Sequence, residues 1–292
     1  MQDLEQWILT HEVPLRMAFT FGILGMMAGW EALAPRRKPR LPKPLRWLNN
    51  LALVALNNLL LRALFPTAAV GVAAFAQARG WGLLNLYPPS LPLALAASVV
   101  ALDLIIYLQH VMFHAVPALW RLHRVHHADP DFDVTTGLRF HPLEILLSLG
   151  VKFAAIVVIG PPVVAVIVFE ILLNATAMFN HGNVSLSPGL DRLLRWFIVT
   201  PDMHRVHHSV EDDEANSNFG FNLSWWDRLL GTYRDSPRRG QRRMTIGIHG
   251  TRHPRHVMWL PAMLWMPFSA PVSGYVINRR SRGKFRKTQE KE

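Results

Sequence analysis

Long runs of apolar residues dominate the first two thirds of the chain. Residues 15–34 are almost entirely apolar, and two similar runs cover residues 51–76 and 91–113. Each run is close to the roughly 20 residues that an α-helix needs to cross the hydrocarbon core of a bilayer. The pattern therefore predicts three transmembrane helices in this part of the chain.

A fourth apolar run, residues 145–179, contains Gly160-Pro161-Pro162 near its middle. Proline lacks a backbone N–H and breaks a helix, so this run predicts two short helices that form a hairpin. The apolar stretch at residues 257–272 carries three prolines, and we expect it to lie on the membrane surface. The expected fold class is an all-α integral membrane protein with about four spans, the fourth of them a proline-broken helical hairpin.

The composition agrees with this class. Half of the 292 residues are hydrophobic and only 17% are charged, and the mean hydropathy is positive, at +0.16. The chain contains no cysteine. This absence excludes disulfides, thiolate metal sites, iron–sulfur clusters and a cysteine nucleophile.

The net charge of +11 is concentrated beside the apolar runs. Residues 36–46 contain six Lys and Arg residues and the tail 274–292 is also basic, whereas residues 1–14 contain none. Positive-inside reasoning therefore places the N-terminus outside and both basic segments in the cytoplasm. Basic residues at such positions fit anionic lipid headgroups. No nucleic-acid-binding module is recognisable, so we expect no nucleic acid as a partner.

Counting the spans forward places the polar residues 114–144 in the cytoplasm. The hairpin at 145–179 then returns the chain to the same side, so both histidine-rich segments that flank it face the cytoplasm. A single crossing at 145–179 would separate them. We therefore expect a cytoplasmic, helical, histidine-rich cap that binds metal.

Nine histidines follow a tandem pattern of H-x-x-x-H, H-x-x-H-H, a single histidine and a second H-x-x-H-H. Residues three and four apart share one face of a helix, so each motif directs its imidazoles toward a common point. Imidazole is the commonest neutral metal ligand, and nine ligands exceed what one ion holds. The pattern predicts a two-metal site formed by His110, His114, His123, His126, His127, His181, His204, His207 and His208.

The residues favour some metals over others. A zinc peptidase would show H-E-x-x-H, but Val111 stands where the glutamate would be. A structural zinc ion would not explain nine ligands at a membrane boundary. Two redox-active irons could activate O2 for attack on a C–H bond. Such nitrogen-rich ligation differs from the carboxylate-rich di-iron sites of soluble bundles.

The motifs resemble those of the fatty acid hydroxylase/sterol desaturase superfamily of membrane di-iron enzymes. The resemblance covers about residues 100–235, including L-H-R-V-H-H at 122–127, F-N-H-G-N at 179–183 and M-H-R-V-H-H at 203–208. It also includes N-F-G at 218–220 and W-D-R-L-L-G-T-Y at 226–233. The resemblance implies O2-dependent oxidation of a C–H bond at two Fe ions, with all nine histidines as catalytic metal ligands. It also implies that members of each H-x-x-H-H motif serve different irons.

Several other polar residues near the motifs have more than one possible role. His141, in Arg-Phe-His-Pro-x-Glu, is either a further ligand or a residue that supports the ligands or holds the fold. Carboxylates commonly orient ligating imidazoles. Asp103, Glu144, Asp202 and Asp227 are candidates for this role.

For Glu144 and Asp227, helix N-terminal charge or a salt bridge is the alternative. Glu170, inside the hairpin, could line a substrate channel or pair with a polar neighbour. Trp225 and Trp226 are expected to be interfacial anchors, with substrate contact as the alternative.

The function expected from this resemblance is hydroxylation of a lipid acyl chain by a monooxygenase in a bacterial inner membrane. Its substrate is expected to be an ornithine lipid, another aminolipid or a sterol-like molecule. A desaturase using the same irons is the nearest alternative, and a non-enzymatic metal-binding membrane protein is the second. Because the chain has neither a dinucleotide-binding fingerprint nor a haem module, we expect a separate ferredoxin or cytochrome with its reductase to supply electrons.

Overall fold

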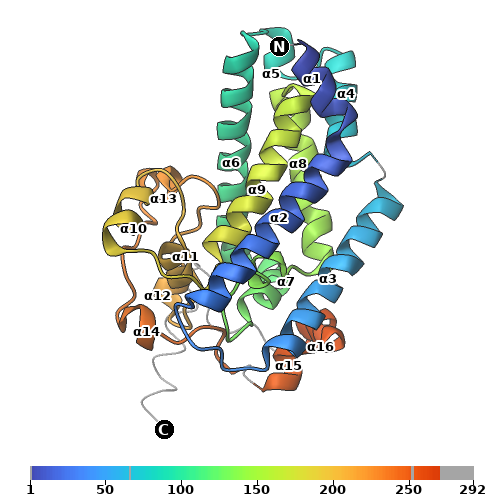
Figure 1. Ribbon diagram of the computed structural model, residues 1–292. Coiled ribbons are helices and arrows are strands. Elements are labelled where there is room, and N and C mark those ends of the chain that lie inside the picture. Colours follow the sequence, from blue (N-terminus) through green and yellow to red (C-terminus); the bar gives the residue numbers. More distant parts are fainter. Residues whose placement is uncertain (1, 66, 251–252, 270–292) are drawn as a thin grey trace.

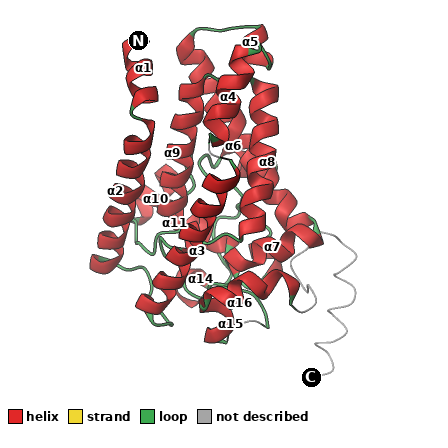
Figure 2. Ribbon diagram, turned by 90° about the vertical axis from the view of Figure 1, so that its right-hand side faces the viewer, coloured by secondary structure: helices red, strands yellow, loops and turns green. Residues whose placement is uncertain are grey.

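The fold is built from helices. The computed structural model describes residues 2–65, 67–250 and 253–269, and every regular element in these residues is helical (Figures 1 and 2). The all-α fold class expected from the sequence is confirmed. The basic tail at residues 274–292 lies outside the described residues.

Five stretches among the described residues are long and apolar enough to cross a membrane. Four are single helices: α2 (Glu12–Leu33), α6 (Leu91–Ala115), α8 (Pro142–Ile159) and α9 (Val163–Asn180). The fifth, Lys43–Leu86, combines α3 (Lys43–Leu64), α4 (Ala68–Ala78) and α5 (Leu83–Leu86). These helices indicate an integral, multi-pass membrane protein.

The long helices run alongside one another in both views (Figures 1 and 2). Helix α1 (Gln2–Thr10) and α5 lie at one end of the bundle. The shorter helices gather at the other end. They are α7 (Pro117–His127), η1 (Thr136–Leu138), α10 (Pro188–Leu194), α11 (Pro201–His207), α12 (Asp212–Ala215), α13 (Trp225–Leu229), α14 (Gly240–Arg243), α15 (Pro254–Met258), α16 (Leu260–Trp265) and η2 (Met266–Phe268).

The second span differs from the apolar run at 51–76. Helix α3 begins at Lys43, and the chain leaves the helix before α4 starts at Ala68. The first turns of α3, which the apolar run does not include, carry polar residues. Arg46 and Asn50 are buried there against the loop that follows α7. The apolar stretch at 257–272 forms short helices as far as Phe268.

The predicted hairpin is present, and α8 and α9 meet at Gly160. Gly160 has φ +67°, a left-handed conformation that glycine adopts without a steric penalty. Gly82, with φ +95°, lies against it so closely that a Cβ atom on Gly82 would be 2.3 Å from the Gly160 nitrogen. The hairpin tip is therefore held by direct backbone packing against the turn before α5.

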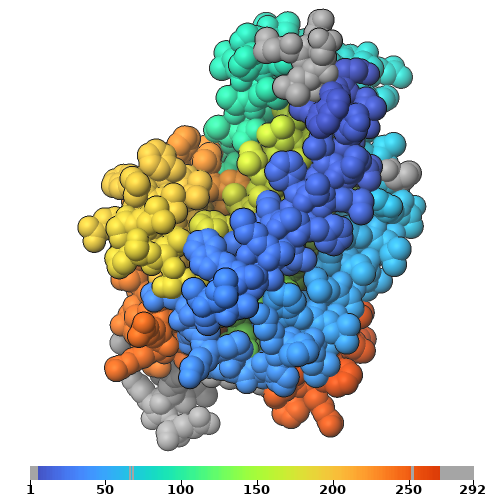
Figure 3. Space-filling model, viewed as in Figure 1, coloured from blue at the N-terminus to red at the C-terminus, as the bar shows by residue number. Residues whose placement is uncertain are grey.

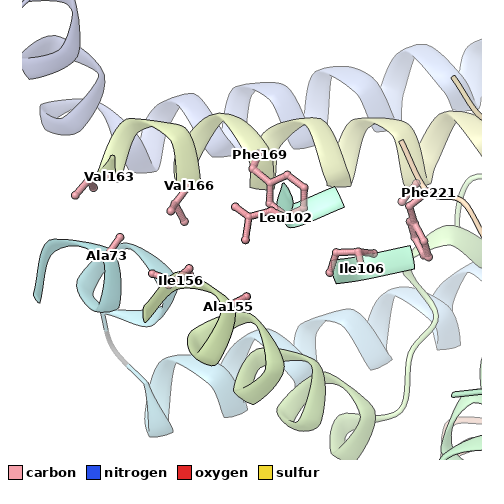
Figure 4. Close-up of a cluster of buried hydrophobic side chains, with 11 residues drawn as sticks. Ala73, Leu102, Ile106, Ala155, Ile156, Val163, Val166, Phe169 and Phe221 are labelled. Atoms are coloured by element: carbon pink, nitrogen blue, oxygen red, sulfur yellow. The ribbon is translucent and has the colours of Figure 1, made fainter. Parts of the chain in front are cut away.

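An apolar core joins the hairpin to its neighbours (Figure 4). Leu102 and Ile106 of α6 pack with Ile156 of α8 and with Val166 and Phe169 of α9. These side chains are at most 8% exposed. Because lipid is as apolar as these side chains, van der Waals packing between the helices stabilises this core. The core thus fixes the positions of the α6 and α9 ends from which site residues project.

Glu170 of α9 takes part in an ion-pair cluster inside the bundle. Its carboxylate lies 2.6 Å from Nζ of Lys152 on α8 and 2.7 Å from Nη1 of Arg16 on α2. The structure thus shows the pairing alternative for Glu170. Pairing reduces the free-energy cost of placing these charges within apolar helices.

Candidate metal centre

The nine histidines of the tandem pattern converge at one end of the bundle. They lie on the last turns of α6, on α7, just after α9, and on and just after α11. All nine are at most 3% exposed. Residues nearly 100 positions apart in the chain thus share one buried site.

The imidazoles fall into two groups. Within each group, one ring nitrogen from every member lies within 4.8 Å of the others, an arrangement that could hold a metal ion. Group A consists of His110, His114, His123, His127 and His207. Group B consists of His126, His181, His204 and His208.

Both H-x-x-H-H motifs are divided between the groups. His123 and His127 belong to group A, whereas His126 points into group B. In the second motif His207 belongs to group A, while its neighbours at 204 and 208 belong to group B. Each motif therefore contributes to both groups, as the resemblance implies.

Distances between Nε2 atoms fit ligands around a common ion. The His110 Nε2 atom is 3.1 Å from that of His123 and 3.0 Å from that of His207. In group B, the His181 Nε2 atom is 3.1 Å from those of His126 and His204. Bonds of roughly 2.1 Å from one ion would place adjacent nitrogen ligands about 3 Å apart.

Backbone carbonyls set the tautomer of three rings. The Nδ1 atoms of His110, His181 and His207 lie 2.7–2.8 Å from the carbonyl oxygens of Phe219, Ala177 and Ser217, respectively. A carbonyl only accepts a hydrogen bond, so Nδ1 carries the proton in each ring. The Nε2 lone pair is then free to bind a metal.

Burial keeps the rings neutral. It lowers the pKa of His123 and of His181 to about 3. Burial, followed by the nearby imidazoles, also lowers the pKa of His126 and His208 well below the usual value. Neutral imidazole is the form that binds metal.

His208 provides a further test of fit. Both of its ring nitrogens are buried without a hydrogen-bond partner among the described residues. Leaving a buried polar group unsatisfied costs about 1–3 kcal/mol. A metal ion in group B would satisfy one of these nitrogens, so the donor set fits a metal.

Glu144 orients one ring of group A. Its Oε1 atom lies 2.6 Å from Nδ1 of His123, and both side chains are buried. Of the four carboxylates considered from the sequence, Glu144 is the one in contact with a histidine of the two groups in the part of the chain that the structure describes.

Asp227 acts on the site through the backbone. Its two carboxylate oxygens accept hydrogen bonds from the backbone N–H groups of Phe219 and Gly220, at 2.8 and 2.9 Å. The Phe219 carbonyl in turn accepts from His110. Burial raises the pKa of Asp227 to about 6. Asp227 therefore fixes the segment that positions the His110 ring.

Asp103 and Asp202 have different partners. Asp103 accepts hydrogen bonds from the backbone of Leu223 and from the indole of Trp226, so it anchors the segment before α13 to α6. Asp202 pairs with Arg36 and Arg205. Neither residue orients an imidazole in the described structure.

Trp225 and Trp226 have different surroundings. Trp225 is 40% exposed and donates its indole N–H to the carbonyl of Trp196. This exposure fits an interfacial position. Trp226 is instead held by Asp103.

His141 lies outside both groups and caps a helix. Its Nδ1 atom accepts a hydrogen bond from the backbone of Leu143 at the start of α8, and Nε2 lies 3.2 Å from the Leu264 carbonyl. Of the two roles considered for His141, the structure shows the one that holds the fold.

A buried polar network behind the site was not anticipated from the sequence. Asp129 and Asp133, on the loop after α7, pair with the buried Arg46 of α3. Asp131 accepts hydrogen bonds from the backbone N–H groups of Arg40 and Leu41. The available signal was the alternation of acids directly after the first H-x-x-H-H motif. These contacts hold the loop against α3 and thereby support α7.

Comparison with known proteins adds evidence about this region. Residues 95–232 match the family model described as fatty acid hydroxylase. All nine histidines, Asp103, Glu144 and Asp227 lie within the matched residues. No solved structure matches the chain significantly.

Three relatives with stated activities share between 27% and 34% identity with parts of this chain. Ornithine lipid hydroxylase OlsE of Rhizobium tropici is 29% identical over 67% of this chain and 57% of its own length. Alkylglycerol monooxygenase of Xenopus tropicalis is 34% identical over 44% of this chain and 27% of its own length. Human cholesterol 25-hydroxylase is 27% identical over 45% of this chain and 48% of its own length. The chain thus spans less than two thirds of the length of each relative.

Proposed function

We propose that the protein is a membrane-bound, O2-dependent di-iron monooxygenase that hydroxylates a lipid acyl chain, because residues 95–232 match the family model described as fatty acid hydroxylase. The observation that carries the proposal is the pair of buried imidazole groups at one end of an apolar helical bundle.

Group A would hold one iron and group B the other. When bound, the irons would supply the activation of O2 that an unreactive C–H bond requires. The protein's contribution is to hold nine neutral imidazoles in place. Glu144 fixes the His123 ring. Asp227 fixes the backbone whose Phe219 carbonyl accepts a hydrogen bond from His110.

Aromatic side chains shield the site from water. Phe219 and Phe221 lie against His110, with ring centroids 5.5 and 5.3 Å from its ring, and Phe140 stacks on His126 at 4.5 Å. These rings are apolar neighbours for both the ligands and an incoming acyl chain. Excluding water protects a reactive centre from side reactions.

The substrate proposed is a membrane lipid with an amino-acid headgroup, such as an ornithine lipid. Support comes from the similarity to OlsE, which covers more of this chain than the similarities to the alkylglycerol and cholesterol enzymes described above. A sterol-like substrate is the less supported choice. We further propose that the metal end of the bundle faces the cytoplasm of a bacterial inner membrane, since Arg36–Arg40 flank the same end.

Two alternative functions predict different products. A desaturase would use the same irons and remove two hydrogens from the substrate. A non-enzymatic metal-binding protein would produce neither change. Mass spectrometry of lipids from expressing cells separates the three, because hydroxylation adds one oxygen atom.

Replacement of His126 tests the proposal most directly. The His126→Ala variant should insert into the membrane, lose bound iron and form no hydroxylated lipid. His256→Ala provides the control, because it removes an exposed histidine outside both groups and should keep both iron and product. Unchanged product in His126→Ala would refute the di-iron assignment.

A further inference from the structure

A basic hollow lies on the surface beside group B. Its lining includes Arg37, Lys38, Arg40 and Phe132. Figure 3 shows the blue loop between α2 and α3, which carries the three basic residues, at the molecular surface. The hollow therefore opens at the end of the bundle where the histidines gather.

Its charge is predominantly positive and partly unneutralised. Lys38 and Arg40 are exposed, and among the described residues neither takes part in an ion pair. The two carboxylates of the lining have partners within it: Asp133 pairs with Arg46, and Asp131 accepts from the backbone N–H groups of residues 40 and 41. Partial burial and the positive charge of Arg40 lower the pKa of Arg37, although Asp131 opposes this effect. The rim is thus a crowded cationic surface.

One aromatic ring separates this surface from the candidate metal centre. Phe132 is only 4% exposed, and its ring stacks on His181 with centroids 5.3 Å apart. The same ring lies 5.0 Å from the His208 ring and beneath the guanidinium of Arg205. A molecule seated in the hollow would therefore be separated from two members of group B by a single side chain.

We propose that this hollow is the docking site for an acidic, one-electron carrier protein of the ferredoxin class. The inference rests on the proposed function, because a monooxygenase reaction consumes two electrons and two protons for each O2. Two successive dockings would supply the two electrons, each oxidising one carrier molecule by one electron. Charge complementarity favours a protein with carboxylates around its redox group, since such surfaces steer association and set the orientation of docking.

The test is binding of an acidic plant-type [2Fe–2S] ferredoxin to the full-length protein in nanodiscs. Wild type should bind it in low salt, and the Kd should rise steeply as salt screens the charges. The double variant Lys38→Glu/Arg40→Glu should weaken binding by about tenfold or more. Arg79→Glu, an exposed arginine at the opposite end of the bundle, should leave the Kd unchanged.

Binding that does not depend on salt, or that is unchanged in the double variant, would overturn the proposal. An anionic lipid headgroup could occupy the hollow instead. Comparison of nanodiscs of phosphatidylcholine alone with nanodiscs that also contain phosphatidylglycerol tests this occupant. If the double variant lost anionic lipid but kept ferredoxin, the hollow would be a headgroup site instead.

The metal-free His126→Ala variant separates this inference from the proposed function. Docking requires the surface and not the iron, so this variant should bind ferredoxin like wild type. Wild type that binds ferredoxin but holds no iron or forms no hydroxylated lipid would contradict the proposed function alone. Retained iron and product with no binding by wild type would contradict the docking site alone.

Discussion

The Oε1 atom of Glu144 lies 2.6 Å from the Nδ1 atom of His123, and both side chains are buried. Glu144 occupies the first turn of α8, whereas His123 lies in the middle of α7. An acid at the start of a candidate membrane span therefore orients an imidazole of group A. The contact links the geometry of the metal centre to the position of the hairpin.

Removing this carboxylate should weaken metal binding. Glu144→Ala leaves the His123 ring without its acceptor, and we expect metal affinity to fall about 10- to 100-fold. Glu144→Gln retains an acceptor oxygen and should lose less. Iron content after dialysis against graded chelator concentrations measures both variants. Equal iron retention by Glu144→Ala and wild type would show that the contact does not support the metal.

Asp227 should matter for metal binding although it contacts no histidine. Asp227→Asn offers one acceptor oxygen where two backbone N–H groups need acceptors. One buried N–H group is then left without a hydrogen bond, which lowers the free energy of unfolding by about 1–3 kcal/mol. The Phe219 carbonyl would shift away from His110, and the iron content of group A should fall. Thermal unfolding and metal analysis together measure the two effects.

Asp213→Asn is the control for that experiment. Asp213 is a partly exposed acid of α12 that pairs with Arg234 and Arg238. Exposed pairs of this kind contribute only about 0–1 kcal/mol. A drop in iron content as large in Asp213→Asn as in Asp227→Asn would argue against a specific role for Asp227.

Acid should destabilise the metal-free protein. The pKa of His123 and of His181 is about 3 in the folded state, against 6.5 for an unperturbed histidine. Above pH 6.5 both folded and unfolded states hold neutral rings, so stability does not change with these groups. Between about pH 6.5 and 3 the unfolded chain binds protons that the folded protein excludes. Stability should fall with decreasing pH by up to about 1.4 kcal/mol per pH unit for each ring.

The measurement is the unfolding temperature of chelator-treated protein in detergent at a series of pH values. Metal-loaded protein should resist acid further, because bound metal competes with protons for the same nitrogens. A metal-free protein that gains stability as the pH is lowered from 6.5 would contradict this assignment of neutral, buried rings.

Gly82→Ala should destabilise the bundle at the end opposite the metal centre. The substitution places a Cβ atom 2.3 Å from the Gly160 nitrogen and also strains a residue with φ +95°. We expect a loss of about 2 kcal/mol or more, seen as a lower unfolding temperature. Gly29→Ala is the control, because nothing lies within 4 Å of its added Cβ atom. A Gly82→Ala variant as stable as Gly29→Ala would rule out close packing at the hairpin tip.

Local patterns in the sequence were sufficient to predict the spans, the hairpin and the nine histidines. The Gly-Pro-Pro break depends only on backbone chemistry at residues 160–162, and the histidine motifs depend only on helical spacing. Glu144 was identifiable as a candidate partner because it lies between the first H-x-x-H-H motif and His181.

Roles that depend on distant contacts could not be predicted. Whether Asp103 or Asp227 orients a ring is decided by how the segment at 218–233 packs on α6, more than 100 residues away. The contact between Arg46 and Asp129 joins positions 83 residues apart. Helical spacing alone assigns no histidine to a particular group, because that assignment depends on how α7 and α11 face each other.

The complete burial of the nine rings determines when metal can be acquired. The residues at 204, 207 and 208 are the last members of the two groups along the chain, and they complete both groups. An ion that arrives after this segment has packed finds no exposed imidazole to bind first. For the proposed irons, we therefore expect loading to precede the packing of the segment around α11, and release to require this segment to open.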